Sequence, residues 1–185
     1  DARTGAPEFD LFVKEVHREM TAKAGQKCTA IRRILVPEPQ VEAVIEAVSQ
    51  RLAATRIGAP DQEDTRMGAL ISLEQRRDVL EKVGLIASEA ERVCGDPDAF
   101  AVSGADVAKG AFLPPMLFHC AQPDRAVAAH ETEAFGPVAT VMGYRDLSHA
   151  CALANRGGGS LVVSLVTREA EVARLKSAAV GAVGF

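Results

Sequence analysis

The sequence predicts one α/β domain in three layers (α/β/α), with helices on both faces of a mostly parallel sheet. Two observations carry this prediction. Segments with apolar residues at helical spacing alternate with short β-branched runs, which is typical of a parallel sheet. The last of these runs, 161–167, is almost continuously apolar, as in a strand covered on both faces. No internal repeat or low-complexity linker divides the 185 residues, so a single domain is expected.

The helices are predicted from apolar side chains that recur every three or four residues. In the first of them, Phe9, Val13, Val16 and Met20 share one face, and Gly25 is well placed to end the helix. The expected helices cover 8–24, 41–52, 73–90, 146–155 and 169–179.

The strands are predicted from short runs rich in Val, Ile, Leu and Phe. Pro37 closes the first run, and a Gly-, Pro- and Asp-rich stretch at 58–68 is expected to be a long loop. The expected strands are 31–36, a short strand around Arg92, 112–119, 137–144 and 161–167.

The composition excludes several classes of protein. Hydrophobic residues make up 48% and charged residues 25%, as in a folded globular protein. The net charge of −4 and the lack of a basic block argue against nucleic acid as a partner. No apolar run reaches the roughly 18 residues of a membrane span, and no signal peptide opens the chain. We therefore expect a cytoplasmic protein with reduced cysteines.

One cysteine stands out as a candidate nucleophile. Cys28 lies in Gly-Gln-Lys-Cys-Thr at 25–29, between a helix end and a strand, among small and polar neighbours. The thiolate is the reactive form of cysteine, and the nearby cations Lys27, Arg32 and Arg33 favour it. The alternative is that Cys28 is a small buried side chain, as most lone cysteines are. Its polar neighbourhood favours the reactive interpretation.

The other cysteines and the histidines receive no chemical role. Packing is the simpler interpretation for the three other cysteines, which form no Cys-x-x-Cys pair. The histidines show no metal-binding spacing, and His149 has no evident partner. No metal is therefore expected. These residues are Cys94, Cys120, Cys151, His17, His119, His130 and His149.

Three ordered motifs resemble those of the aldehyde dehydrogenase superfamily. Gly-Gln-Lys-Cys-Thr at 25–29 is similar to its catalytic cysteine motif, and Glu-Ala-Phe-Gly-Pro at 133–137 is similar to its Glu-x-Phe-Gly-Pro cofactor motif. Residues 57–72 resemble a third block. The stretches 7–33 and 152–161 resemble the branch formed by the dehydrogenase part of the bifunctional ring-opening enzymes of bacterial phenylacetate degradation.

The resemblance implies a fold, a reaction and three site residues. The fold would be the aldehyde dehydrogenase catalytic domain, and the cofactor NAD or NADP. Cys28 would attack the aldehyde carbon, and the resulting thioester would be hydrolysed to the acid. Glu133 would accept hydrogen bonds from the nicotinamide ribose, and Phe135 would pack beside the nicotinamide or ribose. The substrate would be an aldehyde, in this branch a CoA-linked semialdehyde.

The resemblance also implies that parts of the enzyme lie outside these residues. Only 27 residues precede Cys28, too few for a nucleotide-binding domain with its general-base Glu and oxyanion Asn. Residues 1–185 are thus expected to be the catalytic domain alone, without that domain or a hydratase module. The parent protein would be a homo-oligomer.

Two other functions remain open. One is a cysteine-dependent acyltransferase or esterase that uses no nicotinamide. The other is a fragment without chemistry that serves assembly. For the acyltransferase or esterase, the Glu-Ala-Phe-Gly-Pro motif has no explanation.

Overall fold

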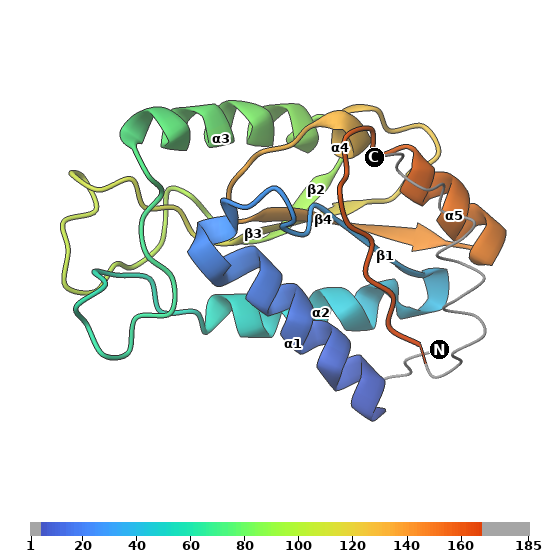
Figure 1. Cartoon of the computed structure of the whole chain (residues 1–185), viewed down its shortest axis with the longest axis horizontal. Helices are drawn as coiled ribbons and strands as arrows, with labels where there is room; N and C mark the ends of the chain where they lie inside the picture. Colours follow the sequence, from blue (N-terminus) through green and yellow to red (C-terminus); the bar gives the residue numbers. More distant parts are fainter. Residues whose placement is uncertain (1–4, 168–185) are drawn as a thin grey trace.

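The computed structural model describes residues 5–167, which surround one four-stranded sheet (Figure 1). The strands lie in the order β1, β4, β3, β2, and β4 pairs in parallel with both β1 and β3. The last pair, β2 with β3, is antiparallel. The predicted mostly parallel sheet is therefore confirmed. The strands are β1 (Arg33–Pro37), β2 (Glu91–Cys94), β3 (Met116–Cys120) and β4 (Val138–Tyr144).

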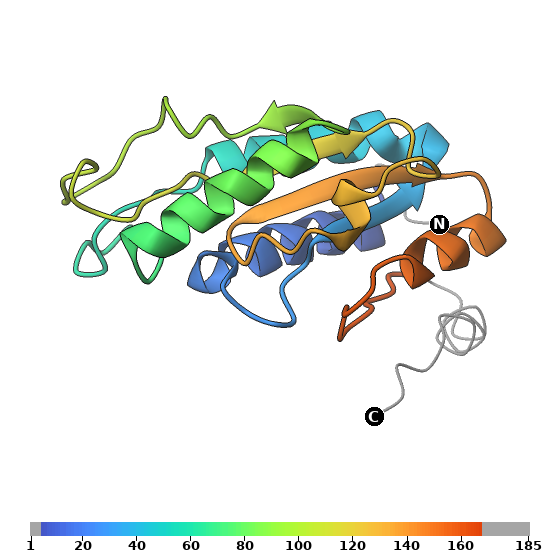
Figure 2. The same cartoon turned by 90° about the horizontal axis from the view of Figure 1, so that it is seen from above.

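The helices cover both faces of this sheet. Figures 1 and 2 show α3 on one face and α1 with α2 on the other, which confirms the three layers. A further helix, α5, contacts β1 and β4. The helices are α1 (Pro7–Thr21), α2 (Val41–Ala53), α3 (Leu73–Ala87), α4 (Ala128–Glu131) and α5 (Leu147–Asn155). Two short 3₁₀ turns are η1 (Ala22–Gly25) and η2 (Glu38–Gln40).

The central strand β4 shows how the sheet is buried on both sides. Val138 and Met142 join the apolar core under α3, whereas Ala139 and Val141 join the core under α1 and α2. Successive side chains of a strand point to opposite faces, so an uninterrupted apolar run supplies both cores.

The third predicted strand starts later than the sequence suggests. The apolar run begins at Phe112, but β3 begins at Met116, after two prolines at 114 and 115. Proline has no backbone N–H to donate to a sheet, so the ladder opens where Met116 N–H donates to the Pro137 carbonyl (2.8 Å).

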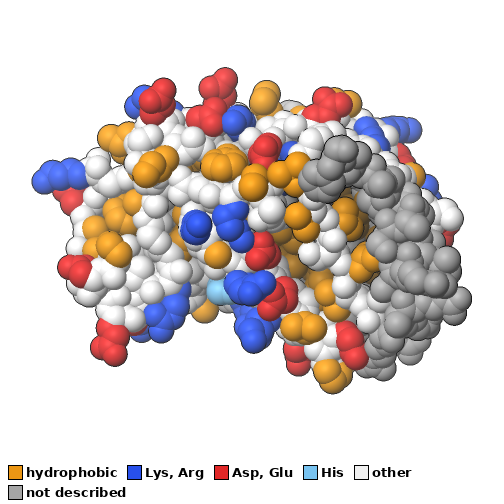
Figure 3. All heavy atoms as spheres, in the orientation of Figure 1, with side chains coloured by type: hydrophobic (Ala, Val, Ile, Leu, Met, Phe, Trp, Pro, Cys, Tyr) orange, Lys and Arg blue, Asp and Glu red, His pale blue; other side chains and the backbone are white. Residues whose placement is uncertain are grey.

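The predicted strand at 161–167 is wrong for this structure. The segment has no regular secondary structure, and its large apolar side chains at 161, 162, 163 and 165 are about half exposed. Apolar composition predicts burial, but a strand also needs a neighbouring strand to pair its N–H and C=O groups. Figure 3 shows hydrophobic side chains along the path that this segment takes in Figure 1. The predicted helix 169–179 lies outside the described residues.

The two motif-bearing loops come together because β1 and β4 are parallel neighbours. One loop leads into β1 at Arg33, and the other leads into β4 at Val138. The amino ends of parallel strands share one edge of the sheet, so both loops meet there. Among residues 5–167, no helix is long and apolar enough to cross a membrane.

Candidate active site

The turn that carries Cys28 has an unusual backbone. After α1 ends, Lys23 (φ 55°) and Ala24 (φ 51°) both adopt the left-handed conformation, followed by Gly25 (φ 70°). Non-glycine residues with positive φ cost energy and occur disproportionately at functional sites. This turn reverses the chain from α1 toward β1 and leaves Cys28 exposed.

Three side-chain contacts hold this turn in place. The Gln26 amide donates to the Lys23 carbonyl (2.9 Å), and its oxygen accepts the Ile71 N–H (3.0 Å). Lys27 forms an ion pair with Glu19 of α1 (2.8 Å). The residues on both sides of Gly25 are thus tied to α1 and to the segment before α3.

The segment with Glu133 and Phe135 is a second strained turn. Phe135 has φ 52°, a genuine outlier for a bulky residue, and the residue is 39% exposed. The Gln75 side chain of α3 donates to the Phe135 carbonyl (3.0 Å). Glu133, two residues earlier, is exposed. The turn therefore presents a carboxylate and an aromatic ring to the outside.

The two turns are in direct contact through glycines. A Cβ on Gly25 would lie 2.1 Å from the carbonyl oxygen of Gly136, and one on Gly136 would lie 2.7 Å from a methyl carbon of Val79. Real Cβ atoms do not approach so closely, so only glycine fits at either position. The structure thereby brings the predicted cysteine motif and the predicted Glu-x-Phe-Gly-Pro motif together.

A small cavity lies between the two segments. Its volume is about 10 Å³, room for about one water molecule. Lys27 and Arg32 line it from one side, and Glu133 and Phe135 from the other.

The three cations near Cys28 in the sequence are all engaged elsewhere. Lys27 pairs with Glu19, Arg32 donates to the Ser160 hydroxyl (2.6 Å), and Arg33 turns inward. Burial, together with the charges of Arg32 and Arg156, lowers the pKa of Arg33 to about 10. The expectation that these charges favour the thiolate is therefore not supported by their contacts.

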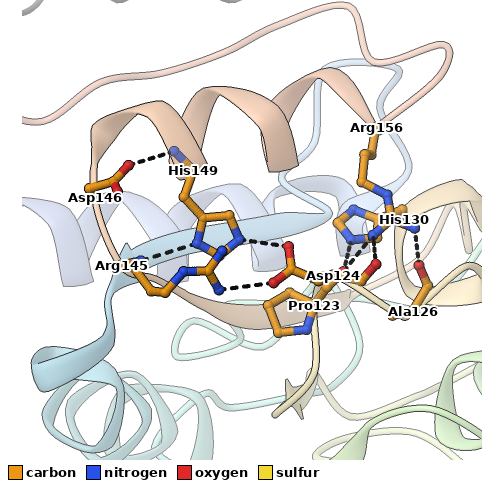
Figure 4. Close-up of polar contacts among 8 residues, drawn as sticks. All are labelled: Pro123, Asp124, Ala126, His130, Arg145, Asp146, His149 and Arg156. Carbon is orange, nitrogen blue, oxygen red and sulfur yellow. Dashed lines mark hydrogen bonds and ion pairs between the residues drawn. The ribbon is translucent and has the colours of Figure 1, made fainter.

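Sequence reasoning missed a polar cluster around the buried His130; Figure 4 shows the contacts of His130 and Arg156 with the segment 123–126. Arg33 donates to Nδ1 of His130 (3.0 Å), and the Nε2 of His130 contacts the Pro123 carbonyl (2.9 Å). Arg156 donates to the carbonyls of Pro123 (2.6 Å), Asp124 (2.9 Å) and Ala126. Only proximity of His130 to the Glu133 motif was visible in the sequence, because its partners are far away along the chain.

The expectation that His149 lacks a partner is wrong. Its Nε2 contacts Asp124 (2.9 Å), and its Nδ1 accepts the Arg145 backbone N–H (3.1 Å). The Arg145 side chain also donates to Asp124 (2.9 Å), and these two side chains lower the pKa of Asp124. Both ring nitrogens of His149 are occupied, so it has none free to act as a base (Figure 4).

The other cysteines fit their structural interpretation to different degrees. Cys120 is buried, whereas Cys94 and Cys151 are partly exposed. Burial raises the pKa of Cys94 and of Cys120, which disfavours their reactive thiolate form. Within residues 5–167, no three His, Cys, Asp or Glu side chains gather in a way that could hold a metal ion.

The chain is similar to two bacterial proteins along much of its length. It is 48% identical over 174 residues to 3,4-dehydroadipyl-CoA semialdehyde dehydrogenase of Aromatoleum evansii, covering 92% of this chain and 33% of the relative. It is 53% identical over 110 residues to Protein MaoC of Klebsiella aerogenes, covering 58% and 31%. The chain thus spans about a third of the length of these relatives.

The fold is also that of a solved dehydrogenase. A crystal structure of betaine aldehyde dehydrogenase from Staphylococcus aureus in complex with NAD⁺ matches with a TM-score of 0.78 and 26% identity. The match covers 92% of this chain and 33% of that one. The sequence profile of the aldehyde dehydrogenase family matches residues 5–184. With that span and the 48% identity, the chain belongs to the aldehyde dehydrogenase family.

Proposed function

We propose that residues 1–185 are the cysteine-bearing catalytic domain of an NAD(P)-dependent aldehyde dehydrogenase. The observation that carries the proposal is the contact between the Gly25 turn and the Gly136 turn, which brings the Cys28 loop to the Glu133 and Phe135 loop. In this proposal the nucleotide-binding domain is contributed by residues outside this chain. This agrees with the comparison, in which the chain spans about one third of the relative's length.

Cys28 has the exposure that a nucleophile needs. Its thiolate would add to the aldehyde carbon and give a thiohemiacetal, whose oxyanion the Cys28 backbone N–H would help to hold. Loss of hydride from that carbon leaves a thioester on Cys28. Water then attacks the thioester, which releases the acid and regenerates the thiol. The hydride acceptor is the nicotinamide, which supplies the two-electron chemistry when bound.

Glu133 and Phe135 fit one end of such a dinucleotide. An exposed carboxylate offers two acceptor oxygens to a pair of ribose hydroxyls, and the partly exposed ring of Phe135 offers an apolar face beside them. The 10 Å³ cavity between the loops is far too small to enclose a dinucleotide. The described residues therefore supply part of a cofactor site. The similar structures include complexes with NAD⁺ and with NADP⁺, so the proposed cofactor is NAD or NADP.

For the substrate we propose a semialdehyde carried on coenzyme A. The support is the 48% identity to an enzyme named for a CoA-linked semialdehyde. We further propose that the parent enzyme is a homo-oligomer that works in the cytoplasm. Free thiols fit a reducing compartment, and all four cysteines are unpaired.

The test is Cys28→Ala in an enzyme that carries this chain at the full length of its relatives. Loss of the nucleophile is expected to lower kcat/KM for aldehyde oxidation by roughly 10⁴-fold or more, measured as NAD(P)H formation. The matched control is Cys151→Ala, a partly exposed thiol on α5 that should leave the rate unchanged. Full activity of Cys28→Ala would remove the assignment. Ester turnover that is indifferent to NAD(P) would favour the acyltransferase or esterase instead.

A further inference from the structure

We propose that His130 is a positioning residue that joins β1 to the helix leading into Glu133 and so sets where Glu133 stands relative to the Cys28 loop. The inference rests on the function proposed above for those two residues. It goes beyond it by assigning a role to a side chain that contacts neither substrate nor cofactor.

The contacts of His130 fix its protonation state. Arg33 has only donors, so Nδ1 of His130 must accept the hydrogen bond from Arg33 Nη1 (3.0 Å). The proton of the neutral ring is then on Nε2, where it donates to the Pro123 carbonyl (2.9 Å). Both ring nitrogens are satisfied, and the residue is only 1% exposed. The neutral Nε2–H tautomer is therefore part of the structure.

Arg33 is itself held in place, so it can serve as a fixed partner. It donates to the Leu153 carbonyl (2.7 Å) and the Ala154 carbonyl (2.9 Å) at the carboxyl end of α5, where the helix dipole favours a cation. A Cβ on Gly157 would lie 1.7 Å from Arg33 Nη2, so only glycine leaves room for the guanidinium.

The hydrogen bond between Arg33 and His130, called the clamp from here on, connects the two walls of the cavity. Arg33 follows Arg32, which lines the cavity from the β1 side. On the other side, the cavity is lined by Ala129, directly before His130, and by Glu133, three residues after it. A shift of α4 away from β1 would therefore move the Glu133 segment relative to the loop that carries Cys28.

The charged groups around His130 favour its neutral form. Burial lowers the pKa of His130, and the positive charges of Arg156 and Arg33 lower it further. The bond to Pro123 and the charge of Glu89 oppose this shift. Glu89 accepts the backbone N–H groups of Val127 and Ala129 at the start of α4. Arg33 faces the ring from β1, Arg156 from the segment after α5, and Glu89 from the segment after α3.

Protonation would break the clamp. A second proton on Nδ1 would turn an acceptor into a donor facing the Arg33 guanidinium, and two cations would meet at hydrogen-bond distance. Because the pKa of His130 lies below 6.5, the ordinary value for a histidine, the ring is still mainly neutral at pH 6.5 and the clamp is intact there. The clamp is lost as the pH falls through the lowered pKa.

The first experiment uses the 185-residue chain and does not depend on activity. The variants are His130→Leu, which keeps an apolar volume without hydrogen bonds, and His130→Gln, which can accept from Arg33 and donate to Pro123 without titrating. Nitrogen NMR should find the Nε2–H tautomer in the unmodified chain. Amide shifts of residues 132–136 should move in His130→Leu and return in His130→Gln. An Nδ1–H tautomer, or unchanged shifts in His130→Leu, would overturn the inference.

The second experiment uses the full-length enzyme and separates positioning from stability. His130→Leu should raise the KM for NAD(P) about tenfold while the rate of thiol labelling at Cys28 changes by less than about twofold. Protonation of His130 should lower kcat/KM at acid pH. His130→Gln, which does not titrate, should restore the KM and remove this fall. The control is His149→Leu, a second buried histidine with two hydrogen bonds, to Arg145 and Asp124. Unlike His130, neither this histidine nor its partners are adjacent in the sequence to a residue that lines the cavity.

The outcomes distinguish this inference from the proposed function. An equal rise in KM for His149→Leu, or a His130→Gln enzyme as impaired as His130→Leu, would reduce His130 to a structural residue. An inactive full-length enzyme would contradict the proposed function, while the NMR shifts would still decide whether His130 positions the Glu133 segment.

Discussion

Backbone strain marks the two motifs at the level of single residues. Lys23, Ala24 and Phe135 are the non-glycine residues with positive φ within 5–167. They flank the Cys28 turn and form the Glu133 turn. Strain of this kind persists only where surrounding contacts hold it, and here Gln26 and Gln75 supply hydrogen bonds to the strained carbonyls. The same two turns that carry the proposed chemistry are therefore the ones built at an energetic cost.

Gly25→Ala should destabilise the protein markedly. The new Cβ would overlap the Gly136 carbonyl, and alanine is strained at φ 70°. We expect a loss of about 2–4 kcal/mol in the free energy of unfolding, measured by urea denaturation. The control is Gly158→Ala, where nothing lies within 4 Å and φ is not positive, so the change should be within about 0.5 kcal/mol. Equal effects of the two substitutions would show that the turns do not touch.

Single residues also show the limit of prediction from the sequence. Cys28, Glu133 and Phe135 are predicted because they lie in short motifs that resemble those of a known family, and Cys28 also because of its small and polar neighbours. The pairing of Arg33 with His130 is not predicted, because the two residues are 97 positions apart and the contact exists only once β1 and α4 are side by side. Local pattern carries no information about such a partner.

At the level of elements, the sequence predicted most helices and strands, but it missed α4 and predicted a strand at 161–167 that the structure does not have. The periodic segments became α1, α2, α3, β4 and α5 with ends shifted by a few residues, and the predicted strands at 31–36 and around Arg92 are β1 and β2. The four-residue α4 has too few turns to show a period, so it was missed. The apolar run at 161–167 has strand-like composition, but none of the strands within residues 5–167 pairs with it.

Helix α3 deserves a direct test because Gln75 and Val79 on it support the Phe135 and Gly136 turn. Ser72 caps this helix by accepting the Gln75 N–H (3.0 Å). Ser72→Ala should lower the free energy of unfolding by about 1 kcal/mol, because the Gln75 N–H in the first turn of the helix loses its acceptor. Ser72→Asp keeps an acceptor at the cap and should retain the stability. The measurement is the melting temperature of each variant. Equal melting temperatures for Ser72→Ala and Ser72→Asp would contradict a capping role for Ser72.

At the level of the whole molecule, stability should rise with pH across the mildly acidic range. The pKa of His17 is lowered by burial and by Arg51, and the pKa of His130 is lowered mainly by burial. Groups with depressed pKa bind fewer protons when folded than when unfolded, so acid favours unfolding below pH 6.5. Each histidine contributes at most about 1.4 kcal/mol per pH unit there.

Urea midpoints between about pH 4.5 and 7.5 measure this dependence. The double variant His17→Gln and His130→Gln should flatten the curve, and each single variant should remove part of the slope. A slope that is unchanged in the double variant would assign the acid sensitivity to other groups.

In the three-layer architecture, burial of apolar side chains is the main source of stability. Two leucines, one in the core and one in the segment 161–167, test which apolar residues contribute to it. Leu117 on β3 is 0% exposed and lies in the core under α1 and α2, whereas Leu165 is 45% exposed in the irregular segment. Leu117→Ala should cost about 2–5 kcal/mol, because it leaves a cavity in a packed core. Leu165→Ala should cost less than about 1 kcal/mol, because much of its surface already meets water. A strand covered on both faces, as the apolar run predicts, would make the two losses similar. The free energy of unfolding of the two variants therefore separates the observed arrangement of 161–167 from the one its composition favours.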